Sequence, residues 1–297
     1  MTTVVFALVP QVLLLDFSGP AQVFSSAGYE LRYVAAHAVV HAAQQLPVQC
    51  ETEMPELNPD DLIVVPGWSG DRLEGSATIP PFVLRALRAH HARGGTVASV
   101  CAGAEALGQA GLLRGRRCTT HHEHQDELAQ RYPDAHVVRD VLFTEDDRIV
   151  TSAGIASGID LALHLVEQRH GPATAARIAR EMVIYTRRNG TAAQESVMLR
   201  HRTHLSDQVH RAQELIDERF ATSIRLAELA DTLGVSERTL TRRFTDTIGL
   251  TPLRYQQMLR VERAEALIAQ GSTVESAARA VGFEDARMLR RLRAASR

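Results

Sequence analysis

The chain contains 297 residues, of which 45% are hydrophobic, and its formal net charge is −2. This length allows two domains that each bury a core, and the balanced charge excludes a uniformly basic nucleic-acid-binding protein, so any DNA affinity must come from locally placed arginines. The cysteine count of 3 is too low, and the spacing too irregular, for a disulfide framework or a zinc site, which favours a reducing cytoplasm. We expect no signal peptide and no membrane anchor, because no segment has the roughly 18 consecutive apolar residues of a spanning helix.

Strands and helices alternate along the first half of the chain. The expected strands are residues 4–9, 31–36, 61–65 and 95–100, and the expected helices are residues 19–24, 81–92 and 101–113. The first helix is expected to open at Gly19–Pro20, and residues 145–147 between two apolar runs indicate the tip of a hairpin. This alternation predicts an α/β fold, with a doubly wound parallel sheet covered on both faces.

The turn after the strand at residues 95–100 is the most informative point of this half. Cys101 follows the buried strand directly, and Ala102–Gly103 keep the turn into the next helix small. At a helix N-terminus, backbone N–H groups and the helix dipole favour a thiolate and a bound anion. Ligands of open α/β sheets also bind outside the carboxyl ends of the strands. Taken alone, a lone cysteine here is about as often a small core residue.

Four segments carry a resemblance to the class I glutamine amidotransferase-like superfamily, in its PfpI/ThiJ branch. They are LLDFSGPAQVF (14–24), VVPGWSG (64–70), SVCAGAEALGQAGLLRGRRCTTHH (99–122) and TSAGIASGIDLALHLVEQRHG (151–171). The resemblance implies a flavodoxin-like sandwich with the cysteine on a strained strand-to-helix elbow. It also implies that Asp16 and His121 lie close to Cys101.

The same resemblance leaves two kinds of activity open. Hydrolases of the branch usually place histidine directly after the nucleophile, whereas this chain has Ala102, so the general base of a cysteine nucleophile is not supplied there. Isocyanide hydratases share the aspartate, the elbow and the Thr-Thr-His motif, so hydratase or amidase chemistry at Cys101 with Asp16 and His121 is the alternative. The favoured interpretation is a metabolite-binding site made of Asp16, Gly67, Cys101, Ala102 and His121.

Other histidines and the end of this half carry weaker signals. His90–His91 and the run at residues 121–124 resemble metal tracts but lack partners at ligand spacing, so we predict no metal and no cofactor. Residues 172–182 form an amphipathic helix that either closes the first domain or makes a subunit contact. The periodicity then fades, which predicts domains at residues 1–188 and 208–297 with a linker at 189–207.

A helix-turn-helix pattern occupies residues 224–249. Apolar residues at helical spacing stop at Gly234, and Ser236 is a good N-cap for a second helix that buries Leu240 and Phe244. The opposite face of that helix carries Arg238, Thr241 and Arg242. Such a helix fits the major groove, where arginine bonds guanine and threonine meets a thymine methyl.

A long helix over residues 253–269 leads to a second copy of this pattern at residues 272–293. The segments LAELADTLGVSERTLTRRF, GLTPLRY (249–255), RVERA (260–264) and VESAARAVGFED resemble the DNA-binding domain of the AraC/XylS family. That resemblance implies two reading helices, with Arg238, Thr241 and Arg242 in the first and Arg287, Arg290 and Arg291 in the second. The run at 292–297 departs from the family pattern, which predicts a poorly buried second unit.

These observations predict a cytoplasmic bacterial transcription regulator. Its expected partners are double-stranded promoter DNA and a small-molecule effector, and we expect a homodimer without membrane association. Related regulators with this architecture imply an amino acid or a quaternary amine as the effector. The alternative is a PfpI-like cysteine enzyme, of the isocyanide-hydratase or amidase type, with a degenerate DNA-binding tail.

Overall fold

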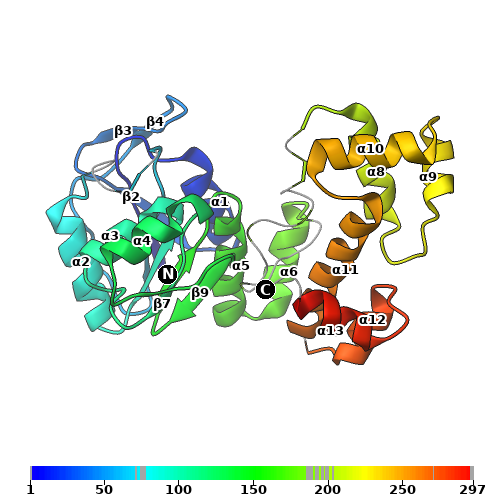
Figure 1. The fold of residues 1–297 in the computed structure, drawn as a ribbon. Coiled ribbons are helices and arrows are strands. Elements are labelled where there is room, and N and C mark those ends of the chain that lie inside the picture. Colours follow the sequence, from blue (N-terminus) through cyan, green and yellow to red (C-terminus); the bar gives the residue numbers. More distant parts are fainter. Residues whose placement is uncertain are drawn as a thin grey trace. The chain divides into compact units, whose positions relative to one another are not determined.

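The computed structural model describes residues 2–70, 72–73, 78–184, 190, 194, 197, 201–202, 204–269 and 271–294. The chain divides into two compact units, Met1–Gln194 and Glu195–Arg297, and each has its own hydrophobic core. Figure 1 shows a sheet flanked by helices in the first unit and a group of helices in the second.

A six-stranded sheet forms the centre of the first unit. The strands lie in the order β2-β1-β5-β6-β10-β9, and every neighbouring pair is parallel except β10 with β9. The strands are β1 (Thr3–Ala7), β2 (Glu30–Val34), β5 (Leu62–Val65), β6 (Thr96–Val100), β9 (Phe143–Asp146) and β10 (Ile149–Ser152). The inner strands are almost wholly buried because helices cover both faces of the sheet.

The helices of this unit pack in two groups. They are α1 (Leu14–Ser26), α2 (Pro81–Ala92), α3 (Ala104–Gln109), α4 (Gln125–Arg131), α5 (Ser157–His170) and α6 (Pro172–Glu181). Helix α5 packs against both α1 and α6, while α2 packs against α3. The two groups lie on opposite faces of the sheet (Figure 1), which confirms the predicted doubly wound α/β fold.

Two predicted helix boundaries in this unit are wrong. Helix α1 begins at Leu14, so Gly19 and Pro20 lie inside it rather than at its start. A Cβ atom at Gly19 would lie 2.8 Å from Cγ1 of Ile159, so this glycine permits close packing of α1 on α5. The helix expected over residues 101–113 is instead one 3-10 turn, η1 (Cys101–Gly103), followed by the short α3.

Hairpins and small sheets complete the first unit. The hairpin predicted around residues 145–147 is present as β9 and β10. Two small sheets were not predicted, because their strands are too short to show an alternation of apolar residues. In one sheet β3 (Val39–His41) pairs with β4 (Pro47–Gln49), and in the other β7 (Arg117–Cys118) pairs with β8 (His136–Val137). The buried residues of α6 pack on α5, so this helix closes the unit.

The second unit contains two helix-turn-helix pairs joined by one long helix. Its helices are α8 (Asp207–Glu218), α9 (Leu226–Thr232), α10 (Glu237–Ile248), α11 (Pro252–Ala269), α12 (Val274–Ala280) and α13 (Ala286–Ala294). The predicted Ser236 cap is confirmed, since its side chain accepts from the backbone N–H of Thr239 at 3.2 Å. Gly249 ends α10 with a φ of 72°, in the left-handed region that glycine adopts most easily.

The prediction that the second helix-turn-helix is poorly buried is wrong. Ala277, Leu289 and Leu292 belong to a separate core beneath α12 and α13, and Phe283 and Val261 close it. Helix α11 supplies one side of this core and Phe220 packs against its edge. The apolar positions of α13 therefore find partners in the preceding helices.

Among the described residues of the chain, no helix is both long and apolar enough to span a membrane.

The predicted linker at residues 189–207 lies partly outside the described residues. Its described positions nevertheless make specific contacts. Val197 donates its backbone N–H to Glu262 Oε2 at 2.5 Å, and the Arg202 guanidinium pairs with Asp217. Both partners lie in the second unit, so the C-terminal part of this range packs on the helices that follow it.

Candidate functional site

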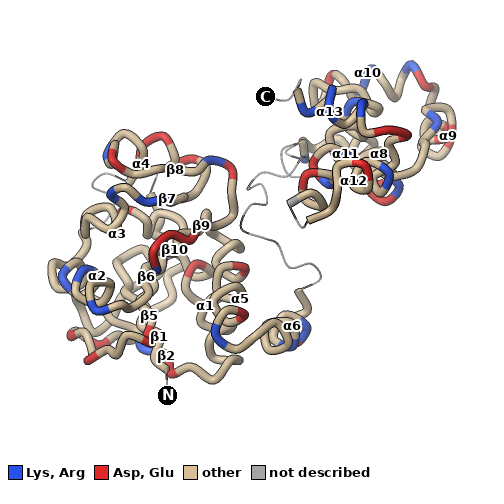
Figure 2. The backbone as a smooth tube through the Cα atoms, turned by 90° about the horizontal axis from the view of Figure 1, so that it is seen from below, with Lys and Arg blue, Asp and Glu red and all other residues tan. Residues whose placement is uncertain are grey.

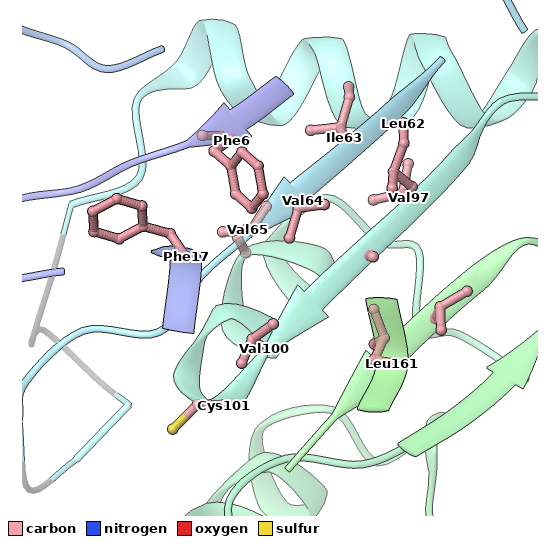
Figure 3. Packing of buried hydrophobic residues seen from close by; sticks show 14 of the residues in the cluster. Phe6, Phe17, Leu62, Ile63, Val64, Val65, Val97, Val100, Cys101 and Leu161 are labelled. Carbon is pink, nitrogen blue, oxygen red and sulfur yellow. The ribbon is translucent and has the colours of Figure 1, made fainter. Parts of the chain in front are cut away.

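Cys101 occupies a strained turn at the end of β6. Its φ is +54°, a left-handed value that a non-glycine residue adopts at a cost of roughly 1 to 3 kcal/mol, and its side chain is only 4% exposed. The turn is so tight that a Cβ atom at Gly103 would lie 2.0 Å from the Val65 carbonyl oxygen, so only glycine fits there. A Cβ atom at Gly154 would lie 2.4 Å from Cβ of Cys101. Figure 3 shows the cysteine where the buried strand ends.

Asp16 lies beside this cysteine, fully buried in the first turn of α1. Its Oδ2 accepts the backbone N–H of Gly67 at 3.1 Å, while Oδ1 makes no hydrogen bond to the described residues. Burial raises the pKa of Asp16 to about 7, against the opposing effects of the Gly67 N–H and the Cys101 thiol. A Cβ atom at Gly67 would lie 2.5 Å from Oδ2, so only glycine allows this approach.

The thiolate expected from the helix N-terminus is not supported by the structure. Burial raises the pKa of the Cys101 thiol, and the neighbouring Asp16 carboxyl raises it further. The backbone N–H of Ala102 acts in the opposite direction but is outweighed. The sequence showed the favourable N–H groups, whereas the buried carboxyl comes from helix α1, far away in the chain. Together these effects raise the pKa of Cys101 and favour its neutral thiol over the thiolate.

The Thr-Thr-His segment borders the same turn. The Thr120 hydroxyl donates to the Cys101 carbonyl oxygen at 2.8 Å. The next residue, His121, is half-buried and its Nδ1 lies 3.4 Å from Oε2 of Glu123. Its ring also lies against His122, with centroids 4.2 Å apart. The structure thus brings Asp16, Gly67, Cys101 and Ala102 together, while the ring of His121, the residue after Thr120, is paired to Glu123.

One further residue reaches this turn and was missed by the sequence analysis. The Gln194 carboxamide donates to the carbonyl oxygens of Thr120 at 2.9 Å and Val141 at 3.0 Å. The Gln194 backbone N–H also donates to Oδ1 of Asp140 at 2.9 Å. A single glutamine in a polar stretch carries no sequence signal for such a role. Gln194 attaches the end of the first unit to the segment that supports Cys101.

The histidine pair at residues 90–91 has structural partners. His90 Nε2 lies 2.9 Å from the Asp61 carbonyl oxygen, and His91 Nε2 lies 2.8 Å from that of Asp147. Within the described ranges, no three His, Cys, Asp or Glu side chains are grouped so that they could hold a metal ion.

Helix α10 presents the first set of predicted DNA-reading residues. Arg238 and Arg242 are exposed and Thr241 is half-buried, while Leu240 and Phe244 on the opposite face are buried. An open groove of about 610 Å³ runs along this face. Its lining residues are Leu226, Glu237, Arg238, Thr241, Arg242, Thr245 and Asp246.

Helix α13 presents the second set. Arg287, Arg290 and Arg291 are exposed, and Figure 2 marks basic positions along both α10 and α13. Arg290 forms an ion pair of 2.6 Å with Glu275, in which both side chains are largely exposed. The Asp285 carboxylate caps the helix by accepting the backbone N–H groups of Arg287 and Met288 at 2.8 and 3.1 Å. Helix α13 is therefore a formed, capped helix with an arginine face.

Comparison with known proteins separates the chain into the same two parts. A model of the DJ-1/PfpI family matches residues 2–168, and a helix-turn-helix domain model matches residues 229–294. The transcriptional regulator CdhR of Pseudomonas aeruginosa is 30% identical over 250 residues, which are 82% of this chain and 72% of CdhR. The regulator GbdR of the same species is 33% identical over 189 residues, which are 63% of this chain and 50% of GbdR.

Two further similarities are to an enzyme and to a solved structure. The isonitrile hydratase of Pseudomonas putida is 35% identical over 176 residues, which are 57% of this chain and 73% of that enzyme. A crystal structure of an AraC family transcriptional regulator from Pseudomonas putida superposes with a TM-score of 0.53 at 22% identity, and covers 61% of this chain and 100% of that one. The latter similarity shows the fold alone.

The buried Asp16–Cys101 turn, the α/β sheet and the paired helix-turn-helix units define a DNA-binding transcription regulator with a ligand-sensing domain. The chain belongs to the DJ-1/PfpI family, and its C-terminal part is a DNA-binding domain of the AraC type.

Proposed function

We propose that α10 and α13 read promoter DNA and that a small metabolite bound beside Asp16 and Cys101 modulates this binding. The observation that supports the first part is the exposed arginine face on the second helix of each helix-turn-helix unit. Arginine bonds guanine in bidentate fashion in the major groove, and Thr241 lies between two such arginines to meet a thymine methyl. CdhR and GbdR, the similar regulators, support the same function.

The proposed effector site consists of Asp16, Gly67, Cys101, Ala102 and His121. A cationic amine suits it, because a positive charge next to the buried Asp16 carboxyl would favour the ionised form that burial now disfavours. Amino acids and quaternary amines are both of this kind. The regulator itself is proposed to act as a homodimer, which a mass measurement in solution at micromolar concentration tests.

Hydratase chemistry at Cys101 is the second candidate, and the similarity to an isonitrile hydratase favours it. The neutral Cys101 thiol and the Ala102 neighbour argue for binding without turnover, since a thiol nucleophile needs a base or a lowered pKa. A purified chain that hydrates isocyanides, and loses this activity on Cys101→Ala, would favour the enzyme.

Selection of bound sequences from a random duplex pool tests the DNA-binding proposal. We expect two short boxes with centres about one helical turn, ~10 base pairs, apart, because two reading helices on one domain enter successive major-groove segments. A single box would mean that only α10 reads bases. No preference over bulk duplex at moderate salt, with or without candidate effectors, would overturn the proposal.

Gln194 is proposed to transmit the state of the effector site to the following segment. Gln194→Ala removes the carboxamide that bonds Thr120 O and Val141 O, so we expect unchanged DNA affinity without effector and a reduced change in affinity on effector addition. Binding titrations with and without effector measure this difference. Gln168→Ala is the matched control, since this carboxamide bonds the exposed Glu145 instead. A normal effector response in Gln194→Ala would rule out this route.

A further inference from the structure

Helix α11 is shared by the two helix-turn-helix units, and Arg260 lies at its middle. The helix runs over the 18 residues Pro252–Ala269 and packs against α8 and α10 as well as α12 and α13. The Arg260 side chain is half-buried between these two groups of helices. The groups that Arg260 contacts therefore connect the two helix-turn-helix pairs.

The Arg260 guanidinium binds carbonyl groups beside both helix-turn-helix pairs of the second unit. Nε and Nη2 donate to the carbonyl oxygens of Phe220 at 2.6 Å and Thr222 at 2.7 Å, which lie in the loop after α8. Nη1 donates at 2.8 Å to the carbonyl oxygen of Gly282, in the turn between α12 and α13. The same guanidinium lies 5.6 Å from the centroid of the Phe283 ring. One side chain thus links the loop that precedes the first helix-turn-helix to the turn of the second helix-turn-helix.

Two neighbouring features make this link tight. Gln256, one helical turn earlier, donates to the same Phe220 and Thr222 carbonyl oxygens at 2.9 and 2.8 Å. Gly282 has a φ of +84°, and a Cβ atom there would lie 1.8 Å from the Ala221 carbonyl oxygen. The loop after α8 and the turn before α13 are therefore in direct contact, without room for any side chain between them.

We propose that Arg260 is a positioning residue that sets the placement of α13 relative to α10, and hence the spacing of the two DNA boxes that the protein recognises. This inference rests on the proposed function, in which both helices contact bases. The planar guanidinium presents donors in a fixed fork, so it can hold three carbonyls from two segments in one arrangement. A lysine ammonium has no such fork and is not expected to replace it.

The test compares duplexes that carry both selected boxes at the selected spacing, both boxes with one to five base pairs inserted, or one box alone. We expect the wild-type protein to bind the selected spacing much more tightly than the inserted series, because rigidly linked heads engage two sites at once only at the matching separation. In Arg260→Ala the affinity for the selected spacing should fall by about tenfold or more, approaching the affinity for one box. The affinity for one box should change by less than about threefold, because Arg260 bonds the protein backbone.

Matched variants separate positioning from general effects. Arg263→Ala removes an exposed arginine from the same helix and should keep the spacing preference. Arg260→Lys should behave like the alanine variant, and circular dichroism shows whether each variant is folded. If Arg260→Ala does not fold, Gln256→Ala removes two of the supporting bonds and should weaken the spacing preference in the same direction.

The possible outcomes distinguish this inference from the proposed function. A folded Arg260→Ala protein, or failing that a folded Gln256→Ala protein, with the wild-type spacing preference would overturn the positioning role. An equal loss on one-box and two-box duplexes would also overturn it, since Arg260 would then act on the first head alone. A wild-type protein that selects no boxes would instead overturn the proposed function, and the positioning role with it.

Discussion

Replacing Asp16 with asparagine is expected to make the free energy of unfolding of the first unit less dependent on pH. Relative to the wild type, the variant should be more stable at pH 8 than at pH 5 by roughly 2 to 3 kcal/mol. The reason is that burial raises the pKa of this carboxyl from 3.8 to about 7 in the folded protein. At pH 8 the wild-type protein must keep an ionised carboxylate in a site without exposure to water, whereas asparagine stays neutral. Denaturant unfolding of the full chain at the two pH values, followed by a probe in the first unit, measures the difference.

The sign of this effect follows from the number of protons bound by each state. Between pH 3.8 and about 7 the Asp16 carboxyl carries its proton in most folded molecules but in few unfolded ones. The contribution of this group to stability is therefore fully present below pH 3.8 and is lost as the pH rises through about 7. With asparagine at position 16 this part of the pH dependence should disappear.

Asp61→Asn is the matched control for Asp16→Asn. Asp61 is also buried, but its two carboxylate oxygens accept the backbone N–H groups of Thr3 and Asn58, both at 2.7 Å. An amide in its place leaves one of these N–H groups without an acceptor, so this variant should be less stable at pH 8. A wild-type stability that does not fall between pH 5 and 8 would contradict the expected role of Asp16. It would also remove the basis for a cationic effector there.

The parts of the fold that could be predicted are those encoded by local periodicity and end signals. The runs that became β1, β5 and β6 are apolar and short, and Ser236 and Gly249 mark the ends of α10 in the sequence. Gly19 was misread as a helix start because its role is a packing contact with Ile159, far away in the chain. Contacts of that kind leave no periodic signal.

The candidate site shows the same division. The resemblance predicted that Asp16 lies close to Cys101, and the structure brings both to Gly67, but burial raises the pKa of the thiol where the sequence favoured a thiolate. The sequence displays the helix N-terminus that lowers a thiol pKa, whereas the burial that raises it depends on the whole packed unit. Gln194 and Arg260 were missed as linking residues because both act on backbone carbonyl groups, which every residue possesses.

Arg242→Ala is expected to reduce discrimination at one base pair of the first box by roughly 1 to 3 kcal/mol, or about 5- to 150-fold in affinity. Arg242 is exposed and lines the groove along α10 together with Arg238 and Thr241. A bidentate arginine–guanine contact is lost in the variant, so binding should weaken on the selected box and change little on a duplex with another base at that position. Competition titrations with the four variants of that base pair measure the effect.

Arg243→Ala is the matched control, because Arg243 is the next residue on α10 but does not line the groove, and its guanidinium bonds the side chain of Gln208. Its loss should leave the preference among the four base pairs intact. A phosphate contact of Arg242 would give a different result. Arg242→Ala would then weaken binding equally on all four duplexes and on random DNA, and the slope of log affinity against log salt concentration would fall in magnitude by about 1. Base reading by the first helix would then have to come from other groove residues with suitable donors or methyl groups, such as Arg238, Thr241 and Thr245.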